Sequence, residues 1–136
     1  MFTGESTVRV RYAETDQMGY VYYGNYAMYY EVARAEALRA AGFPYKKLED
    51  MGIMMPVLEN KSKYLKAGKY DELLTLKITI PKMPMVKIII HCDIYNESKE
   101  LINQGETILA FVNMASGKPC RIPPELKEVF APFFSD

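Results

Sequence analysis

The sequence lacks both an excess of charge of one sign and a long apolar run. Its 17 Lys and Arg residues balance its 17 Asp and Glu residues, so the net charge is zero. Nucleic-acid-binding proteins normally carry a basic excess, and this balance argues against a nucleic-acid partner. No apolar run approaches the roughly 20 residues that span a bilayer, and the N-terminus shows no basic region followed by an apolar run. We therefore expect neither a membrane span nor a signal peptide.

Cysteine and histidine are scarce. Cys92 and Cys120 lie far apart and outside any CxxC arrangement, so we expect reduced, partly buried thiols in a cytoplasmic protein. The one histidine, His91, lies on an expected strand but out of register with its apolar residues, and we expect it to face solvent or an interface. With one histidine and scattered acids, the sequence predicts no metal site and no Ser-His-Asp set.

The residues that are present suit a globular protein, with 49% hydrophobic and 25% charged residues. A chain of this length most naturally forms one domain, here residues 1–136, and buries roughly two-thirds of its unfolded surface without metals or disulfides. Nine methionines and eleven tyrosines accompany a complete absence of tryptophan. The flexible methionine side chains either fill gaps in the core or line a deformable apolar pocket.

A strand, a loop and a long helix are expected in the first third of the chain. Alternating apolar and polar residues over 7–12 predict a half-buried strand, and residues 13–24 show no periodicity, as in a loop. Over 25–41 apolar residues recur every three or four positions, with Asn25 as N-cap and Gly42 as the stop. This helix is apolar over most of its circumference, so we expect the rest of the fold to enclose it largely.

The remainder of the chain is expected to be mostly strands. Alternating apolar residues predict four of them, over residues 55–65, 74–80, 86–94 and 107–114. Short turns between the last three imply an antiparallel sheet, because parallel pairing needs long crossovers. A short helical turn over 45–52 precedes these strands, and Pro123 and Pro124 open a short C-terminal helix. One sheet with one enclosed helix makes a two-layer α+β fold.

The loop before the long helix combines an acid, Asp16, with two glycines, Gly19 and Gly24, in the stretch YAETDQMGYVYYGNYAMYYE. A single loop acid is often a solvated residue or a turn former. Loops held by rigid elements also carry function, glycines let a substrate approach the backbone, and the first turn of a helix has free N–H groups. A carboxylate beside such N–H groups is the minimum needed for attack on a carbonyl: the acid is base or nucleophile, and the N–H groups hold the oxyanion.

The same stretch resembles the active-site signature of a known enzyme family. The pattern Asp16-x-x-Gly19-x-Val21-x-Tyr23-Gly24-Asn25-Tyr26 is similar to that of the 4-hydroxybenzoyl-CoA thioesterase family, which has the hotdog fold. The resemblance is to the bacterial Tol-Pal-associated type and covers nearly the whole chain, through VRVRY, Tyr30-Glu31-x-Ala33-Arg34-x-Glu36, YDELL at 70–74 and Lys118-Pro119-x-Arg121-x-Pro123. It implies a hotdog fold, in which an antiparallel sheet wraps around one long central helix.

The resemblance also implies an activity, namely hydrolysis of an acyl-CoA to a free acid and coenzyme A without a metal or redox cofactor. Asp16 takes the position of the catalytic carboxylate, as base or nucleophile, and the backbone N–H of Tyr23 takes the position that polarises the thioester carbonyl. Many relatives of the Tol-Pal-associated type carry histidine where this chain has Tyr23, a change that is silent if only the N–H acts. Other expected substrate-binding residues are Tyr12 (or a core role for it), Gly19, Val21, Gly24, Asn25 and Tyr26.

Several basic residues are candidates for the phosphates of coenzyme A, which need cations. Lys61, Lys63 and Lys66 lie close together with Lys69, and Lys118 and Arg121 follow the last strand. Lysines on an edge strand also protect a sheet from aggregation, so these residues have an alternative role.

Glu31 is an alternative acid, because some hotdog thioesterases use an acid on the central helix. Its spacing to Arg34 is i,i+3, and we expect an ion pair between the two instead.

The resemblance implies a homodimer or a dimer of dimers, with the active site at the subunit interface. Two other functions stay open: hydrolysis of acyl groups on acyl carrier protein, and a non-catalytic acyl-binding role. The acyl group is open as well, since tyrosines and methionines suit an aromatic group and a medium aliphatic chain equally.

Overall fold

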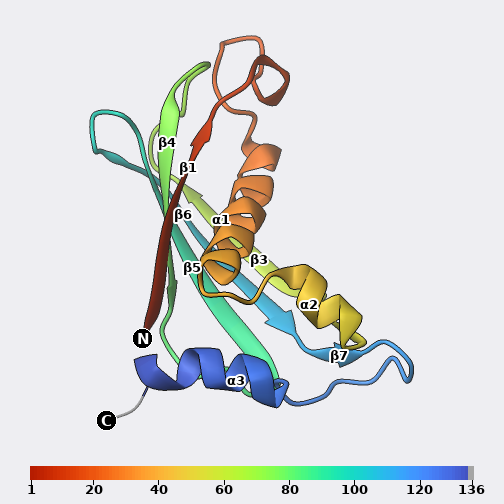
Figure 1. Ribbon diagram of the computed structural model, residues 1–136. Helices are drawn as coiled ribbons and strands as arrows, with labels where there is room; N and C mark the ends of the chain where they lie inside the picture. Colours follow the sequence, from red (N-terminus) through yellow and green to blue (C-terminus); the bar gives the residue numbers. More distant parts are fainter. Residues whose placement is uncertain (135–136) are drawn as a thin grey trace.

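Five antiparallel strands form the main sheet of the protein (Figure 1). The computed structural model describes residues 1–134. The strand order is β1-β4-β5-β6-β3, with the bounds β1 Phe2–Arg9, β3 Val57–Tyr64, β4 Leu73–Ile80, β5 Lys87–Tyr95 and β6 Leu101–Ala110. Two short strands, β2 (Ile53–Met54) and β7 (Val112–Asn113), form a separate antiparallel pair. The antiparallel sheet predicted from the short turns is confirmed.

Helix α1 (Tyr26–Ala40) lies across one face of the sheet, and α2 (Tyr45–Asp50) follows its C-terminal end (Figure 1). Helix α3 (Pro124–Phe130) closes the end of the fold near the N-terminus. Three short 3-10 turns complete the described elements: η1 Tyr12–Glu14, η2 Tyr23–Asn25 and η3 Ala131–Phe133. Gly42 adopts φ +85° just after α1, so the predicted helix stop is confirmed.

The core lies between α1 and the sheet. The apolar residues that alternate along β4 and β5 all face this layer and are buried: Leu74, Leu76, Ile78, Ile80, Ile88, Ile90, Cys92 and Ile94. Burial of one face of each strand is what a period of two predicts. These two strands therefore form the floor on which α1 rests.

Helix α1 is enclosed on one side. Its residues toward the sheet recur at spacings of three and four and are buried, namely Tyr26, Tyr29, Tyr30, Ala33 and Ala37. On the other side Met28 is 38% exposed, and Ala27 and Glu31 are exposed as well. The expectation of a largely enclosed helix is wrong for the single chain, because one sheet covers one face of a helix.

Two predicted strands also have wrong bounds, and the first of them was predicted over 7–12 but runs over Phe2–Arg9. Strand β1 ends at Arg9, and Tyr12 lies in η1 with 81% of its surface exposed, because the chain turns where the Arg11 side chain folds back onto Glu14. The last long strand begins at Leu101 and ends at Ala110, whereas 107–114 was predicted. Its first half carries polar residues on the inner face, and the chain leaves the main sheet to pair β7 with β2.

The structure also places the two cysteines and the single histidine. Cys92 is buried and Cys120 partly buried, both as free thiols, and His91 is exposed beside Glu106, with Nε2 3.1 Å from Oε2. The expected exposure of His91 is confirmed, and the cytoplasmic location stays a prediction. Within residues 1–134, none of the helices combines the length and the apolar character that crossing a bilayer requires.

Candidate active site

Asp16 closes a tight turn in the loop between β1 and α1. Its Oδ1 accepts hydrogen bonds from the N–H groups of Met18 (2.9 Å) and Tyr20 (3.2 Å). The Asp16 N–H donates to the Tyr20 carbonyl at 2.8 Å, and Gly19, with φ +78°, supplies the left-handed residue that the turn requires. The turn-forming role considered for Asp16 is therefore confirmed, and it fixes the direction of the carboxylate.

The same carboxylate borders a cavity of about 350 Å³. The cavity is lined by Asp16, Tyr20, Val21, Tyr23, Tyr26, Tyr64, Leu65, Lys66 and Ala67. Both side-chain hydrogen bonds that Asp16 makes to residues 1–134 use Oδ1. Its second oxygen, Oδ2, accepts no hydrogen bond from these residues.

The N-terminal end of α1 presents free backbone donors beside this cavity. Tyr23 and Gly24 begin η2, and their N–H groups donate to no acceptor in the described part of the chain. The positive end of the helix dipole lies in this direction, which favours negative charge. A Cβ on Gly24 would lie 2.9 Å from a Tyr22 ring carbon, so glycine keeps this turn compact. Asp16 and Tyr23 thus line one cavity, the first with a carboxylate and the second with a backbone N–H that is free within residues 1–134.

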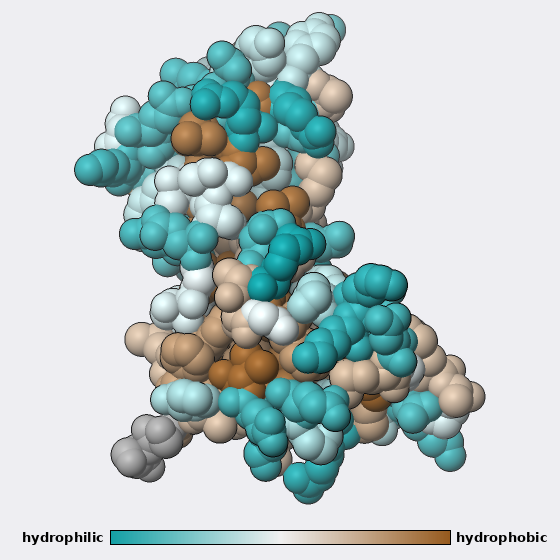
Figure 2. All heavy atoms as spheres, viewed as in Figure 1, coloured by the Kyte–Doolittle hydropathy of each residue, from teal (hydrophilic) through white to brown (hydrophobic). Residues whose placement is uncertain are grey.

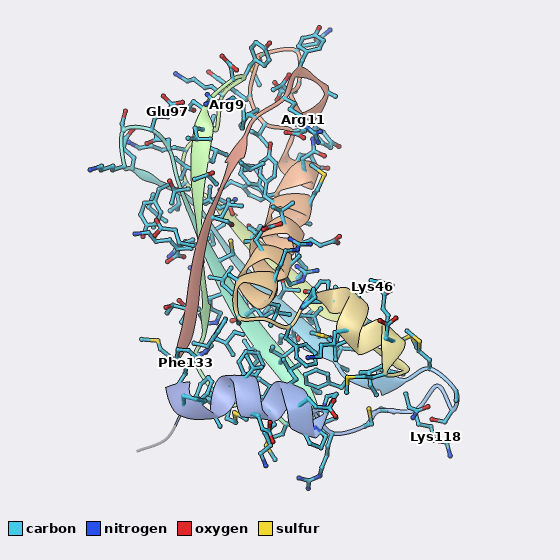
Figure 3. All side chains as sticks on the ribbon, in the orientation of Figure 1. Arg9, Arg11, Lys46, Glu97, Lys118 and Phe133 are labelled. Atoms are coloured by element: carbon cyan, nitrogen blue, oxygen red, sulfur yellow. The ribbon has the colours of Figure 1, made fainter. Side chains whose placement is uncertain are left out.

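A buried acid, Glu14, holds the loop and the helix together. Its Oε1 accepts from the Tyr29 hydroxyl (2.8 Å) and from the Arg11 N–H (3.0 Å), and its Oε2 accepts from Arg11 Nε (2.7 Å). The Glu14 carbonyl accepts from the Tyr22 N–H and from Asn25 Nδ2, both at 2.9 Å. Arg11 lies at the end of the molecule where this loop meets α1 (Figure 3). Glu14 therefore positions the residues on either side of the Tyr23 amide.

Gly68 follows the lining residue Ala67 and packs against the Asp16 loop. Its carbonyl accepts the Val21 N–H at 2.8 Å, and its N–H donates to the Tyr26 hydroxyl at 3.3 Å. A Cβ at this position would lie 3.1 Å from Val21 Cγ2 and 3.3 Å from the Tyr26 hydroxyl oxygen. Glycine therefore lets the segment after β3 pack directly on the loop.

Comparison with known proteins now identifies the family. Residues 10–130 match the sequence profile of the thioesterase-like superfamily. The chain belongs to this superfamily.

Individual relatives align with this chain over most of their length. YneP of Bacillus subtilis (strain 168), provisionally named an acyl-CoA thioesterase, is 34% identical over 119 residues, which cover 88% of this chain and 86% of YneP. YbgC of Escherichia coli O6:H1, an acyl-CoA thioester hydrolase, is 29% identical over 123 residues, 90% of this chain and 92% of YbgC. The crystal structure of the DHNA-CoA thioesterase from Staphylococcus aureus aligns with a TM-score of 0.92 and 33% identity, covering 98% of this chain and 91% of that one.

These comparisons confirm the predicted α+β hotdog fold, in which an antiparallel sheet packs around a long central helix. They support the thioesterase-like superfamily as a whole. The narrower resemblance to 4-hydroxybenzoyl-CoA thioesterases stays a prediction.

The fold brings some of the predicted substrate-binding residues to the Asp16 cavity and places others elsewhere. Val21, Tyr26 and Lys66 line the Asp16 cavity, and Lys66 also forms an ion pair with Glu100. Gly19, Gly24 and Asn25 shape the loop beside it. Tyr12 projects from η1 and packs edge-to-face on Tyr70, with ring centroids 6.0 Å apart. The substrate contacts of all these residues stay predictions.

Lys61, Lys63 and Lys118 do not line the Asp16 cavity, whereas Lys69 pairs with Tyr20 beside it. Lys61 and Lys63 line a different hollow together with His91 and Glu106. Lys118 lies in the loop after β7, at the far end of the molecule (Figure 3). Phosphate contacts of these residues stay predictions.

Two further groups of candidate residues can be placed. Glu31 and Arg34 form the predicted ion pair, with Oε2 3.9 Å from Nη2, which leaves Asp16 as the acid on the cavity wall. No three His, Cys, Asp or Glu side chains within residues 1–134 gather as metal ligands would.

Sequence reasoning missed Glu14 and Gly68 as parts of the site. The i,i+3 spacing of Arg11 and Glu14 was a weak signal for the first, because surface ion pairs show the same spacing. Gly68 has no local signal, because its contacts with Val21 and Tyr26 are long-range.

We expect Glu14→Gln to destabilise the protein by about 1–3 kcal/mol at pH 7, because the neutral amide of glutamine is a weaker hydrogen-bond acceptor than the buried carboxylate. Burial alone would raise the pKa of Glu14, but hydrogen bonds from the Arg11 N–H, the Tyr29 hydroxyl and the Arg11 side chain outweigh burial and hold this pKa below its usual value of 4.5. A lowered folded-state pKa gives stability that is present above pH 4.5 and is lost as the pH falls through the folded-state value. Urea unfolding at pH 7 and pH 3.5 measures both effects.

The stability difference between wild type and Glu14→Gln should therefore shrink at pH 3.5. Glu5→Gln is the matched control, since Glu5 is exposed on β1. An equal loss of stability in both variants would contradict the positioning role of Glu14.

Proposed function

We propose that the protein is an acyl-CoA thioesterase that hydrolyses an acyl-CoA to a free acid and coenzyme A. Its membership of the thioesterase-like superfamily and the names of YneP and YbgC support this activity. The observation that carries the proposal is the pairing of the Asp16 carboxylate with the free Tyr23 N–H at one cavity. Each group supplies one requirement of thioester hydrolysis.

In the proposed reaction Asp16 acts as base or as nucleophile. As a base, it takes a proton from water while the water oxygen bonds to the thioester carbon. The Tyr23 N–H stabilises the resulting oxyanion, the carbon–sulfur bond then breaks, and the thiolate leaves and takes up a proton. As a nucleophile, Asp16 forms a mixed anhydride and expels the thiolate, and water then releases the acid. Both routes use the same two groups, and neither requires a metal or redox cofactor.

Coenzyme A is part of the substrate in this proposal, and its phosphates need cationic partners. Lys66 is the basic residue on the wall of the Asp16 cavity. Its partner Glu100 is 44% exposed, so a phosphate can compete for the ammonium group at the surface. Lys66 is therefore our first candidate for a phosphate contact.

We also propose a homodimer that forms through β3. This strand is the outer edge of the sheet, and along it Val57 and Leu58 are each 50% exposed and Tyr64 is 53% exposed. An exposed edge strand leaves backbone N–H and C=O groups unpaired, which invites pairing with another strand. Antiparallel pairing of two β3 edges about a two-fold axis extends the sheet, and it sets the partner subunit beside the Asp16 cavity, which Tyr64 and Leu65 line.

Leu58→Glu should therefore shift the protein from dimer to monomer, because it adds a charge to the pairing edge without disturbing the core. Analytical ultracentrifugation over a range of concentrations measures the change. Met85→Glu is the matched control, since Met85 is 43% exposed in the turn between β4 and β5. A wild type that sediments as a monomer, or a Leu58→Glu variant that stays dimeric, would refute the β3 interface.

The experiment that tests the activity is thiol release from a panel of acyl-CoAs. The panel contains aliphatic chains of several lengths and aromatic acyl groups, since the Staphylococcus aureus neighbour is a DHNA-CoA thioesterase. Matching acyl groups on acyl carrier protein are run in parallel. Turnover of at least one acyl-CoA, faster than its carrier-protein counterpart, is the expected result. If no thiol is released from any acyl-CoA, the proposed function is wrong.

A further inference from the structure

Asn25 occupies the N-cap position of α1 but does not use its side chain as a cap. An N-cap residue normally has extended backbone angles, and its side chain accepts a hydrogen bond from the first turn of the helix. Asn25 has φ −84° and ψ −12°, which are helical values, and its side chain makes no capping hydrogen bond within residues 1–134. Its Nδ2 instead donates to the Glu14 carbonyl at 2.9 Å, across eleven residues of chain. The side chain therefore connects the start of α1 to η1.

The Glu14 carbonyl joins the two segments that carry the proposed chemistry. It accepts the Tyr22 N–H and Asn25 Nδ2, both at 2.9 Å. Tyr23, whose N–H is the proposed oxyanion donor, lies between these two residues in the chain, and Asp16 follows Glu14 by two positions. One carbonyl thus holds the turn that contains the Tyr23 amide from both sides, next to the segment that carries the carboxylate.

Glu14 is itself held firmly in place. The residue is 4% exposed, and its carboxylate accepts from the Tyr29 hydroxyl at 2.8 Å and from Arg11 Nε at 2.7 Å. Tyr29 is fully buried on α1, the helix that begins directly after Asn25. The Glu14 carbonyl is therefore a rigid acceptor against which the Asn25 side chain can fix the turn.

This network is complete within one chain. Asn25, Glu14 and Tyr29 lie outside β3, and their hydrogen bonds join the Asp16 loop to α1. The surface at this end of the molecule is mostly hydrophilic, whereas apolar side chains are prominent around α2 and α3 (Figure 2). A second subunit paired along β3 therefore leaves these hydrogen bonds in place.

We propose that Asn25 is a positioning residue, which holds the Tyr23 N–H in place relative to the Asp16 carboxylate through the Glu14 carbonyl. This inference rests on the proposed function. Of the two bonds to the Glu14 carbonyl, only that of the Tyr22 N–H remains without the Asn25 side chain, so the Tyr23 amide gains freedom to tilt. A displacement of about 1 Å in a reacting geometry can cost on the order of 100-fold in rate. Positioning requires no contact between Asn25 and the substrate.

Steady-state thiol release with three variants of Asn25 tests positioning against capping. Asn25→Gln keeps an amide donor but is not a preferred N-cap, whereas Asn25→Ser is a good N-cap whose hydroxyl is too short to reach the Glu14 carbonyl. If Asn25 positions the Tyr23 amide, kcat should fall at least about tenfold in Asn25→Ala and Asn25→Ser, and less in Asn25→Gln. KM should stay within about threefold of wild type, since Asn25 is not a lining residue of the Asp16 cavity.

Asn113→Ala is the matched control. The Asn113 side chain also bonds to the backbone, accepting the Ala115 N–H at 2.9 Å and the Ser116 N–H at 3.1 Å, but it does so in the loop that follows β7. Its loss should lower the midpoint of thermal unfolding and leave kcat unchanged. Thermal unfolding of every variant ensures that kcat is compared among folded proteins.

A wild-type kcat in Asn25→Ser, as capping alone predicts, would overturn the proposal, and this variant decides the question even where Asn25→Ala fails to fold. A raised KM with a wild-type kcat in Asn25→Ala would also overturn it and would make Asn25 a substrate contact. If wild type itself releases no thiol from any acyl-CoA, the proposed function fails together with this inference. Turnover by wild type with an unchanged kcat in the variants refutes the inference alone.

Discussion

Asp16→Asn should lower kcat for the best acyl-CoA by at least two orders of magnitude, or roughly 3 kcal/mol of transition-state stabilisation. The amide has no negative charge, so it neither takes a proton from water nor attacks the thioester. Its carbonyl oxygen can still accept the N–H groups of Met18 and Tyr20 in place of Oδ1. The turn should therefore survive while the chemistry is lost, and KM should change little.

Steady-state thiol release with wild type and the variant measures this effect, with thermal unfolding as the check on folding. Asp71→Asn is the matched control: Asp71 is another exposed loop acid, and its φ of +69° suits asparagine as well as aspartate. The control should retain wild-type kcat. If Asp16→Asn hydrolyses the substrate within a few-fold of wild type, Asp16 is not the catalytic acid, and Glu31 is the next carboxylate to replace.

Asp16→Ala separates the two roles of this residue. Alanine removes the acceptor of both turn hydrogen bonds as well as the charge, so it should raise KM and lower thermal stability in addition to lowering kcat. The difference between the asparagine and alanine variants then measures the contribution of the turn hydrogen bonds, and the asparagine variant alone measures the loss of the carboxylate charge.

The parts of the fold that local physics dictates were predictable from sequence. Strands β4 and β5 bury one face, so their apolar residues alternate, and the alternation gave their position and their inward side chains. Gly42 marked the end of α1 because a left-handed residue after a helix favours glycine. The Asp16 loop was recognisable as well, since its acid and glycines fall within a few residues of one another.

The parts that depend on long-range contacts were not predictable. The sequence alone suggests that Glu14 is a surface acid, because the Tyr29 hydroxyl that donates to it lies fifteen residues later. The sequence of the first half of β6 resembles a polar turn. Asn103 occupies the inner face of this strand, where an apolar residue is expected. The Tyr30 hydroxyl donates to Asn103 Oδ1, which satisfies the buried amide oxygen and allows the strand to start at Leu101.

Gly105 in the same strand should tolerate substitution poorly. A Cβ on Gly105 would overlap the ring and the hydroxyl of Tyr30, and Tyr30 is 2% exposed. The ring has little freedom to move, because its hydroxyl is hydrogen-bonded to Ser62 Oγ (2.9 Å) on β3 and to Asn103 on β6. Gly105→Ala should therefore destabilise the protein by about 3 kcal/mol, near the upper end for overpacking a core, which urea unfolding measures as a lower midpoint.

A double-mutant cycle tests whether Tyr30 causes this loss. Tyr30→Leu removes the ring that the new methyl group would meet, so Gly105→Ala should cost at least about 1 kcal/mol less in that background than in wild type. An equal cost in both backgrounds would assign the loss to the strand backbone. A coupled result would show that glycine, the weakest strand former in β6, is present because a tyrosine of α1 packs directly on the β6 backbone. The same contact explains why a long strand of this sheet carries a sequence typical of a turn.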